Sequence, residues 1–439
     1  MLRAIGVSSV EELFSDIPEE FRFPALDLPE GISEYEVSRE LDRLARKNAP
    51  STIGLEGTFL GAGAYPHYVP AIVDHLSSRG EFATTYTPYQ AEAAQGTLQS
   101  IFEYQSMLAR LLGVDVVNAS HYDGAAAAAE AALMAVRATR RNRVVVADTL
   151  HPQYQEVVAT YLDPIDVALQ TVVTGGADKG PAAAFEPLVA ACSDETACVI
   201  VQNPDFLGRI RDLRVLAQKV HACGALLVVS TNPIALGLFP SPGDQGADIV
   251  TGEGQPLGIP LSYGGPYLGL FGCKKELLRR MPGRLVGETV DTDGNRGFVL
   301  TLNTREQHIR RGRATSNICT NQGLMALRAA IYLAAMGPQG LADTARLCYD
   351  NAHYAASQID GLGGYSVDAR EPFFNEFVVS CPVPAARVVD AVAAGGALAG
   401  YDLSKAFPER KNDLLVCSTE VHTKGDIDRL VGLLEGVAR

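Results

Sequence analysis

Short apolar runs alternate with helical stretches from about residue 61 to residue 281. The runs have the length of buried strands, and the stretches between them carry apolar residues at helical spacing. Strands that alternate with helices build parallel sheets covered on both faces. The pattern therefore predicts a mostly parallel, doubly wound α/β domain. Strands are expected at 114–118, 143–147, 167–173, 197–202, 225–230 and 248–251, and helices at 125–139, 154–161, 187–191 and 213–222.

The pattern changes on either side of this region. Residues 284–302 place Asp-Gly-Asn between two apolar runs, which predicts a hairpin. A linking helix at 322–335 and a small α+β domain with strands near 377–380 and 414–417 follow. At the other end, a Pro-rich stretch precedes a helix at 33–48 that Ser33 and Glu36 can cap. We divide the chain into an N-terminal arm (1–60), which we expect to wrap a partner, a large domain (61–320), and the linking helix with the small domain (321–439).

Composition excludes several classes of function. The 439 residues are 47% hydrophobic, enough for a large core in two or three domains. The net charge of −14 argues against nucleic acid. The eight cysteines form no C-x-x-C pair, so neither a disulfide framework nor a metal site is expected. Apolar runs shorter than the ~20 residues of a membrane span, and a start without an apolar signal core, predict a cytoplasmic protein.

The segment GADIVTGEGQPLGIPLSYGGPYLGLFG, residues 246–272, joins a predicted strand to a glycine-rich turn. Glycines at such a turn let the backbone approach another backbone or a ligand closely. The carboxyl ends of strands are where open α/β sheets bind ligands. The segment nevertheless contains no amine, because no lysine lies between Lys219 and Lys274.

Four long strings carry a family resemblance: 86–105, 118–125, 246–269 and 282–327. They resemble the glycine decarboxylase P-protein family of the glycine cleavage system, in the form split into two chains, and within it the alpha chain, subunit 1. One departure is His121, where an apolar residue would be expected. The resemblance implies fold type I of the pyridoxal phosphate (PLP) enzymes, the PLP-transferase fold.

The resemblance also implies a reaction and an assembly. The complete enzyme, glycine dehydrogenase (decarboxylating), would be an α2β2 heterotetramer. Its beta chain, subunit 2, would carry the Schiff-base lysine and the PLP. Glycine would lose CO2, and the aminomethyl group would pass to the lipoyl arm of H-protein. The alpha chain would shape the entrance and exclude water.

Two parts of a PLP site of this fold are missing from the residues themselves. Lys219 precedes a strand, where it faces the wrong end of the sheet. Lys274 and Lys275 follow the strand YLGLFG and are expected to open the next helix rather than to hold a cofactor. The strand at 225–230 runs into Ser-Thr-Asn-Pro and lacks the acid that would hold the pyridinium nitrogen. The remaining lysines lie in the N-terminal helix, a loop and the C-terminal fifth: Lys47, Lys179, Lys405, Lys411 and Lys424. We predict that this chain binds no PLP covalently and is inactive alone.

Two polar segments are candidates for a shared active site. The loop 84–96 is rich in hydroxyls and amides, and the segment 304–322 adds arginines and a histidine. They either line the partner's PLP site and dock an acidic lipoyl carrier, or tie the linking helix to the large domain. The candidates are Tyr86, Thr87, Tyr89, Gln90, Arg305, His308, Arg311, Thr315, Ser316 and Asn317.

Asp123 and Gly124 precede the alanine-rich helix. They are either a plain N-cap or a vestigial anion site at a helix N-terminus. His121 nearby is either a core or interface histidine or the remnant of a ring that stacks on PLP. Two other functions stay open: a free-standing aminotransferase-like PLP enzyme that uses an unexpected lysine, and a purely architectural subunit.

Overall fold

The structure, a computed structural model, describes residues 1–22, 24–48, 54, 56–174, 183–316, 318 and 321–438. Contacts within the chain form two compact units, residues 1–51 and 52–439. In the first unit, helix α1 (Leu2–Ile5) and two 3-10 turns precede α2 (Glu34–Ala45). Ser33 and Glu36 form the predicted capping box, and α2 buries none of its residues.

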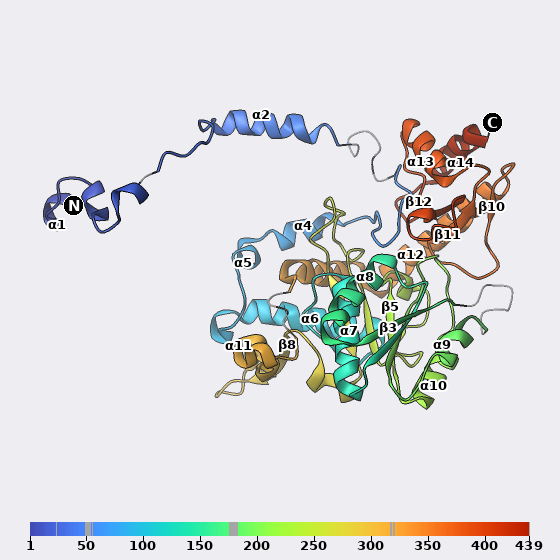
Figure 1. Ribbon diagram of the computed structural model, residues 1–439, viewed down its shortest axis with the longest axis horizontal. Coiled ribbons are helices and arrows are strands. Elements are labelled where there is room, and N and C mark those ends of the chain that lie inside the picture. Colours follow the sequence, from blue (N-terminus) through green and yellow to red (C-terminus); the bar gives the residue numbers. More distant parts are fainter. Residues whose placement is uncertain are drawn as a thin grey trace. The chain divides into compact units, whose positions relative to one another are not determined.

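The second unit is built on a seven-stranded sheet with the order β1-β7-β6-β5-β4-β2-β3 (Figure 1). Strands β2 to β6 run parallel to their neighbours among themselves, whereas β7 pairs antiparallel with both β6 and β1. The mostly parallel sheet is thus confirmed. Its strands are β1 (Val116–Val117), β2 (Arg143–Ala147), β3 (Ala168–Val172), β4 (Thr196–Gln202), β5 (Leu226–Thr231), β6 (Ile249–Glu253) and β7 (Gly269–Cys273).

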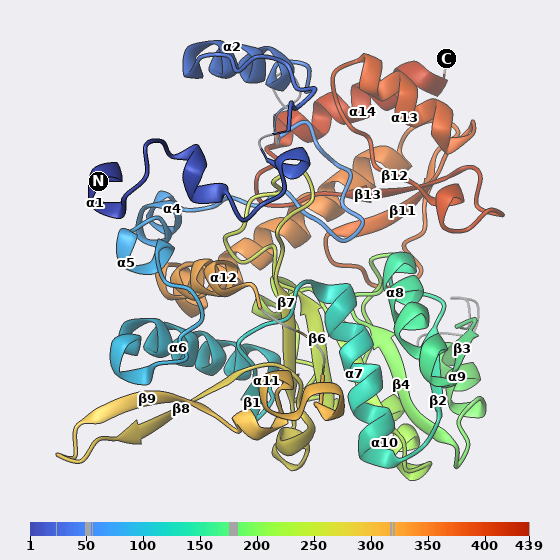
Figure 2. The same ribbon diagram turned by 60° about the vertical axis from the view of Figure 1, so that its left-hand side comes forward.

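Helices cover both faces of this sheet (Figure 2). Successive residues of β2 face different cores: Val144 and Val146 pack with α7 and α8, whereas Val145 and Ala147 belong to the core of the opposite face. This alternation is what a doubly wound sheet requires, because neighbouring side chains of a strand point to opposite faces. The first face carries α7 (Gly124–Thr139) and α8 (Pro152–Leu162), and the second carries α6 (Gln95–Leu112), α9 (Glu186–Ala190), α10 (Arg214–Ala222) and α12 (Gly323–Asp360).

The predicted hairpin is present as β8 (Leu285–Val290) and β9 (Arg296–Thr301), an antiparallel pair. The linking helix begins and ends close to its predicted limits, because Gly337, at φ 61° and ψ −177°, is not helical and interrupts α12. A second helical segment then begins at Pro338 and continues to Asp360. The short helices α4 (Ala71–Ser77), α5 (Gly80–Ala83) and α11 (Gln307–Arg310) lie in the connections.

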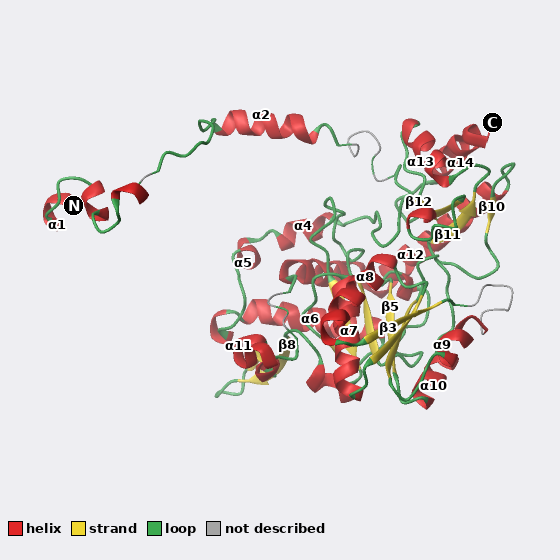
Figure 3. Cartoon of the chain, viewed as in Figure 1, coloured by secondary structure: helices red, strands yellow, loops and turns green. Residues whose placement is uncertain are grey.

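The C-terminal part contains a four-stranded antiparallel sheet, β10-β11-β13-β12, which carries both predicted strands (Figure 3). Helices α13 (Ala385–Ala394) and α14 (Lys424–Ala438) share an apolar core with it. The strands are β10 (Ser366–Val367), β11 (Glu376–Ser380), β12 (Tyr401–Asp402) and β13 (Asp413–Cys417). The domain limits at 60 and 320 stay a prediction. Among the described helices, none is long and apolar enough to cross a bilayer.

Buried ion pairs join this part to the loop after β4. Arg211 Nε lies 2.6 Å from Glu371 Oε2, and Arg209 Nη1 lies 3.5 Å from Glu371 Oε1. Within the loop, Arg209 Nη2 also lies 2.8 Å from Asp205 Oδ2. The Ile210 amide also donates to the carbonyl of Pro372 at 2.8 Å. Because Arg211 and Glu371 are both buried, removing one partner would leave an uncompensated charge.

Candidate functional site

The turn after β6 holds a glutamine rather than an amine. Gln255 is buried, and its side chain accepts from the Tyr65 amide at 2.9 Å and donates to the Tyr65 carbonyl at 3.0 Å. A second bond from Nε2 reaches the carbonyl of Ile259 at 2.8 Å. Gln255 therefore fixes the turn to an extended segment about 190 residues earlier.

Glu253, the last residue of β6, reaches the N-terminus of α7. Its Oε2 accepts from the Gly124 amide at 3.0 Å, and its Oε1 accepts from the amides of Gln255 and Leu268, both at 2.9 Å. Burial raises the pKa of this carboxyl to about 7. Asp123 is the N-cap residue of the same helix, and its side chain accepts from the Ala126 amide at 2.7 Å. The start of α7 thus already holds two carboxylates of this chain.

A second buried carboxylate lies on β11. Glu376 accepts from the Tyr65 hydroxyl at 2.8 Å and from the Ala62 amide at 2.6 Å. Burial raises its pKa to about 7 as well. Tyr65 and Gln255 consequently link Glu253 to Glu376 through one continuous buried network.

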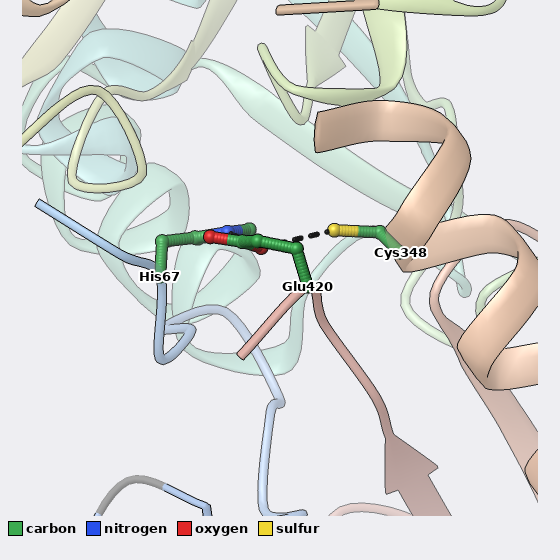
Figure 4. Close-up of side chains that lie close together, drawn as sticks. All are labelled: His67, Cys348 and Glu420. Atoms are coloured by element: carbon green, nitrogen blue, oxygen red, sulfur yellow. Dashed lines mark hydrogen bonds and ion pairs between the residues drawn. The ribbon is translucent and has the colours of Figure 1, made fainter. Parts of the chain in front are cut away.

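Another cluster joins three distant parts of the second unit (Figure 4). Glu420 Oε2 lies 2.7 Å from His67 Nδ1, and it accepts from the Cys348 thiol at 3.2 Å. Glu420 Oε1 accepts from the Tyr68 amide at 2.8 Å. The three possible ligand atoms lie within 4.8 Å of one another. One carboxylate oxygen thus engages His67 Nδ1 and the Cys348 thiol, whereas His67 Nε2 is buried without a hydrogen-bond partner among the described residues. A metal ion held by Nδ1, the thiol and Glu420 Oε2 would have to displace both hydrogen bonds.

The described lysines that border the large sheet do not lie at the carboxyl ends of its parallel strands. Lys274 Nζ lies 2.6 Å from Asp248 Oδ1, just before the start of β6, and Lys219 pairs with Glu186 at the surface. Lys179 lies outside the described residues. Asn232 follows β5, so the expected acid is absent there too. With Gln255, Asn232 and Glu253 at these strand ends, the residues present do not fit a bound PLP.

The glycine-rich turn brings backbone against backbone. A Cβ on Gly252 would lie 2.4 Å from the carbonyl oxygen of Thr231, on the neighbouring strand. Gly252, on β6, therefore serves close packing within this chain, whereas a Cβ on Gly264 in the turn would meet nothing within 4 Å.

The predicted polar loop before α6 lines an open cavity of about 310 Å³. Tyr86 is 88% exposed and Tyr89 56% exposed, and Gln90 is exposed beside them. The exposed faces of these side chains can be reached by a partner. Six of the lining residues are Tyr86, Thr87, Arg284, Asn321, Gln322 and Met325.

Arg284, which sequence reasoning missed, joins the two predicted polar segments. Its guanidinium lies 5.5 Å from the centre of the Tyr89 ring, and Nη1 donates to Asn321 Oδ1 at 3.0 Å. Arg284 also lines a second cavity of about 20 Å³, together with Arg305, Thr315 and Ser316. The position looked like the first residue of a hairpin strand, so the sequence pattern gave no signal for this role.

The other residues of the second segment bond mainly within the chain. Arg305 is buried and donates to the carbonyls of Leu302 at 3.1 Å, Gly283 at 3.0 Å and Met281. The hydroxyl of Ser316 donates to Glu130 at 2.8 Å, and the Thr315 amide donates to the Arg305 carbonyl at 2.9 Å. These contacts favour the structural interpretation for the three residues.

His308 and Arg311 are more open. The His308 ring lies edge-on to Tyr89, with ring centres 5.7 Å apart, and Nδ1 lies 3.6 Å from Glu306 Oε2. Arg311 is exposed at a positive φ of 53°. Asn317 lies outside the described residues. The structure thus groups Tyr89, His308 and Arg284 into one surface, called the Arg284 surface below.

His121 is fully buried against Phe271, with ring centres 4.9 Å apart. Among the described residues, neither ring nitrogen has a hydrogen-bond partner, and burial lowers the pKa of the ring to about 3. The ring packs as an apolar group, which favours the core interpretation.

Comparison with known proteins gives consistent results. The family model "Glycine cleavage system P-protein" matches residues 1–434. A probable glycine dehydrogenase (decarboxylating) subunit 1 from Thermomicrobium roseum is 51% identical over 99% of this chain and 96% of its own, and one from Citrifermentans bemidjiense is 49% identical over the same shares. A crystal structure of glycine decarboxylase (P-protein) in inhibitor-bound form superposes with a TM-score of 0.91 at 42% identity, covering 100% of this chain and 97% of that one. A sphingosine-1-phosphate lyase from Burkholderia pseudomallei, with a TM-score of 0.67 at 14% identity over 96% of this chain and 94% of its own, shares the fold alone. The predicted fold type I of the PLP enzymes is confirmed.

Proposed function

Because this chain belongs to the glycine cleavage system P-protein family, we propose that it works as subunit 1 of a two-chain glycine dehydrogenase (decarboxylating). The assembled enzyme would release CO2 from glycine and transfer the aminomethyl group to the lipoyl arm of H-protein. The relatives that carry this name match nearly the whole chain and are themselves matched over 96% of their length. A cytoplasmic location remains a prediction.

The PLP of the complex would sit on the partner chain, subunit 2, in an α2β2 heterotetramer. The observation that carries this part is what stands at the strand ends: Gln255 and Asn232 offer neither an amine nor a carboxylate, and backbone amides already engage both oxygens of Glu253. PLP supplies the electron sink for decarboxylation when bound. This chain would then contribute to the reaction by positioning groups at the active site rather than by carrying the cofactor.

The Arg284 surface is the part of this chain that we assign to that contribution. Tyr89 and His308 present ring edges and polar atoms at an exposed surface, and Arg284 holds Tyr89 in place from below. A cation and neutral donors at such a position can orient an anionic group and exclude water at an interface. Either the substrate entrance of the partner or the acidic H-protein would meet this surface.

Reconstitution tests the proposal directly. We expect the purified chain alone to show no glycine-dependent CO2 exchange and no PLP absorbance band. Mixed with subunit 2 and lipoylated H-protein, it should restore the exchange. A borohydride-stable PLP label on any lysine of the isolated chain would contradict the assignment and favour a free-standing PLP enzyme.

A purely architectural role is the second candidate, and the internal bonds of Arg305 and Ser316 favour it. Under that role, substitutions on the Arg284 surface would leave turnover unchanged once the tetramer is assembled. The two candidates therefore differ in a measurable rate.

A further inference from the structure

Three backbone amides from three separate segments converge on one carboxylate. Gly124 begins α7, Gln255 follows β6, and Leu268 precedes β7, and each donates to Glu253 at 2.9–3.0 Å. The 16-residue helix α7 adds the positive end of its dipole at Gly124. An arrangement of amides at a helix N-terminus is a favourable environment for an anion.

The surroundings leave the carboxylate with no side-chain cation. Among the ion pairs of the described residues, none includes Glu253, although the residue is only 8% exposed. Asp123 beside it adds a negative charge and contributes to the raised pKa of Glu253. The backbone amides are therefore what compensates for burying this group.

Gly124 is required for the approach. A Cβ at that position would lie 2.3 Å from the Tyr154 hydroxyl and 3.1 Å from the Glu253 amide nitrogen. The absence of a Cβ thus lets the Tyr154 side chain and the backbone at the end of β6 pack directly against the start of α7, where the Glu253 carboxylate accepts from the Gly124 amide.

We infer that Glu253 is a resident anion that takes the place of a cofactor phosphate at the N-terminus of α7. Its carboxylate uses the amide donors that a phosphate would need, and it places a negative charge where a phosphate would add more. Loss of the amine and occupation of the anion position then act together to keep cofactor off this chain. The inference rests on the proposed function only for the identity of that cofactor, because its test measures stability and can fail while glycine decarboxylation is intact.

Chemical rescue of Glu253→Ala tests it. The variant removes the carboxylate, leaves three buried amides without an acceptor and opens space beside them. We expect its melting temperature to rise by roughly 2–5 °C in sodium phosphate or sodium formate, relative to sodium chloride of equal ionic strength, because only an anion that binds the folded state stabilises it. The native chain should show no such difference.

Glu376→Ala is the matched control. Glu376 is equally buried and its pKa is also raised to about 7, but it accepts from Ala62 and Tyr65 and makes no hydrogen bond to α7. We expect no rescue of this variant. Absence of rescue of Glu253→Ala by both anions, or equal rescue of the native chain and both variants, would overturn the inference.

Glu253→Gln keeps the inference testable if the alanine variant does not fold. Glutamine fills the same space, but its single side-chain oxygen cannot accept hydrogen bonds from all three amides. Its NH2 group would also lie opposite a backbone N–H, so that two donors would face each other. We expect a folded chain with a lower melting temperature that neither anion restores. A melting temperature equal to that of the native chain would overturn the role of the charge.

Discussion

The guanidinium of Arg284 lies over the ring of Tyr89, 5.5 Å from its centre, and its Nη2 lies 3.3 Å from the Tyr89 hydroxyl. The contact joins the start of the β8–β9 hairpin to the polar loop before α6. Tyr89 is exposed, whereas Arg284 is buried. The arginine therefore holds the outward-facing tyrosine ring from its inner side. Substitutions in this pair can therefore distinguish an active role of this chain from a scaffolding role.

We expect Arg284→Ala to lower kcat/KM of the reconstituted enzyme about tenfold, which corresponds to about 1.4 kcal/mol of lost stabilisation. The matched control is Arg296→Ala, because Arg296 also lies over an aromatic ring, 5.1 Å from the centre of Phe298, within the same hairpin. The control should keep nearly native activity. Unchanged turnover of Arg284→Ala in an intact tetramer would support the architectural role.

The two carboxyls with raised pKa values predict a pH-dependent stability. Glu253 and Glu376 both titrate near 7 in the folded chain, against 4.5 ordinarily. A raised carboxyl pKa stabilises the folded state below 4.5, and this contribution is lost as the pH rises through 7. The difference amounts to at most about 3 kcal/mol for each group.

Glu376→Gln isolates one of these contributions, because glutamine mimics the protonated acid. Urea unfolding at pH 5.5 and pH 8.0 should show a smaller loss of stability for the variant than for the native chain. The comparison uses the difference between proteins because buried histidines with lowered pKa values, such as His121, act in the opposite direction. If the free energy of unfolding changed equally with pH in both proteins, the titration of a buried Glu376 carboxyl would be contradicted.

Replacement of His121 by phenylalanine should be neutral or stabilising. Both ring nitrogens of His121 are buried without a partner, and unsatisfied polar groups cost about 1–3 kcal/mol each. A phenyl ring can make the same contact with Phe271. We expect an equal or higher melting temperature; a fall of several degrees would indicate a partner for the imidazole.

Sequence patterns predicted the sheet well because burial on both faces makes strands apolar without interruption. They gave no information on partners across long separations. The bond from Gly124 to Glu253 spans 129 residues, and that from Tyr65 to Gln255 spans 190. The string GEGQ therefore appeared only as a flexible turn, although its two polar residues fill the candidate site.

The local pattern also misled at one place. Arg284 stands at the head of a strand, where an exposed arginine would be unremarkable. The candidates Arg305 and Ser316 were correctly placed together, but the sequence could not show that backbone carbonyls and Glu130 already engage them.

The cluster of His67, Cys348 and Glu420 should be independent of metal. We expect dialysis against EDTA to leave the melting temperature unchanged, because the carboxylate already engages His67 Nδ1 and the Cys348 thiol without an ion. Glu420→Gln should lower stability by about 1–3 kcal/mol, since one oxygen must then serve donors that two served before. Stoichiometric zinc found by mass spectrometry would contradict this interpretation.

The N-terminal arm should act in assembly rather than in folding of the second unit. Val37, Leu41 and Leu44 recur at helical spacing on α2, and all three are exposed. We expect Leu41→Glu to weaken association with subunit 2 in sedimentation experiments while the melting temperature of the isolated chain stays the same. Ser38→Glu, which changes charge away from the apolar positions, serves as the control. Equal association of both variants would exclude the arm from the interface.

The ion pairs among Arg209, Arg211, Asp205 and Glu371 have a mechanical consequence. They anchor the loop after β4 to the segment before β11, and a Cβ on Gly208 would lie only 1.9 Å from the Glu376 carbonyl oxygen. Hinge bending between these regions would have to separate buried charges and backbones in van der Waals contact. The second unit is therefore expected to stay rigid during turnover, so that any opening and closing of the active site falls to the partner chain.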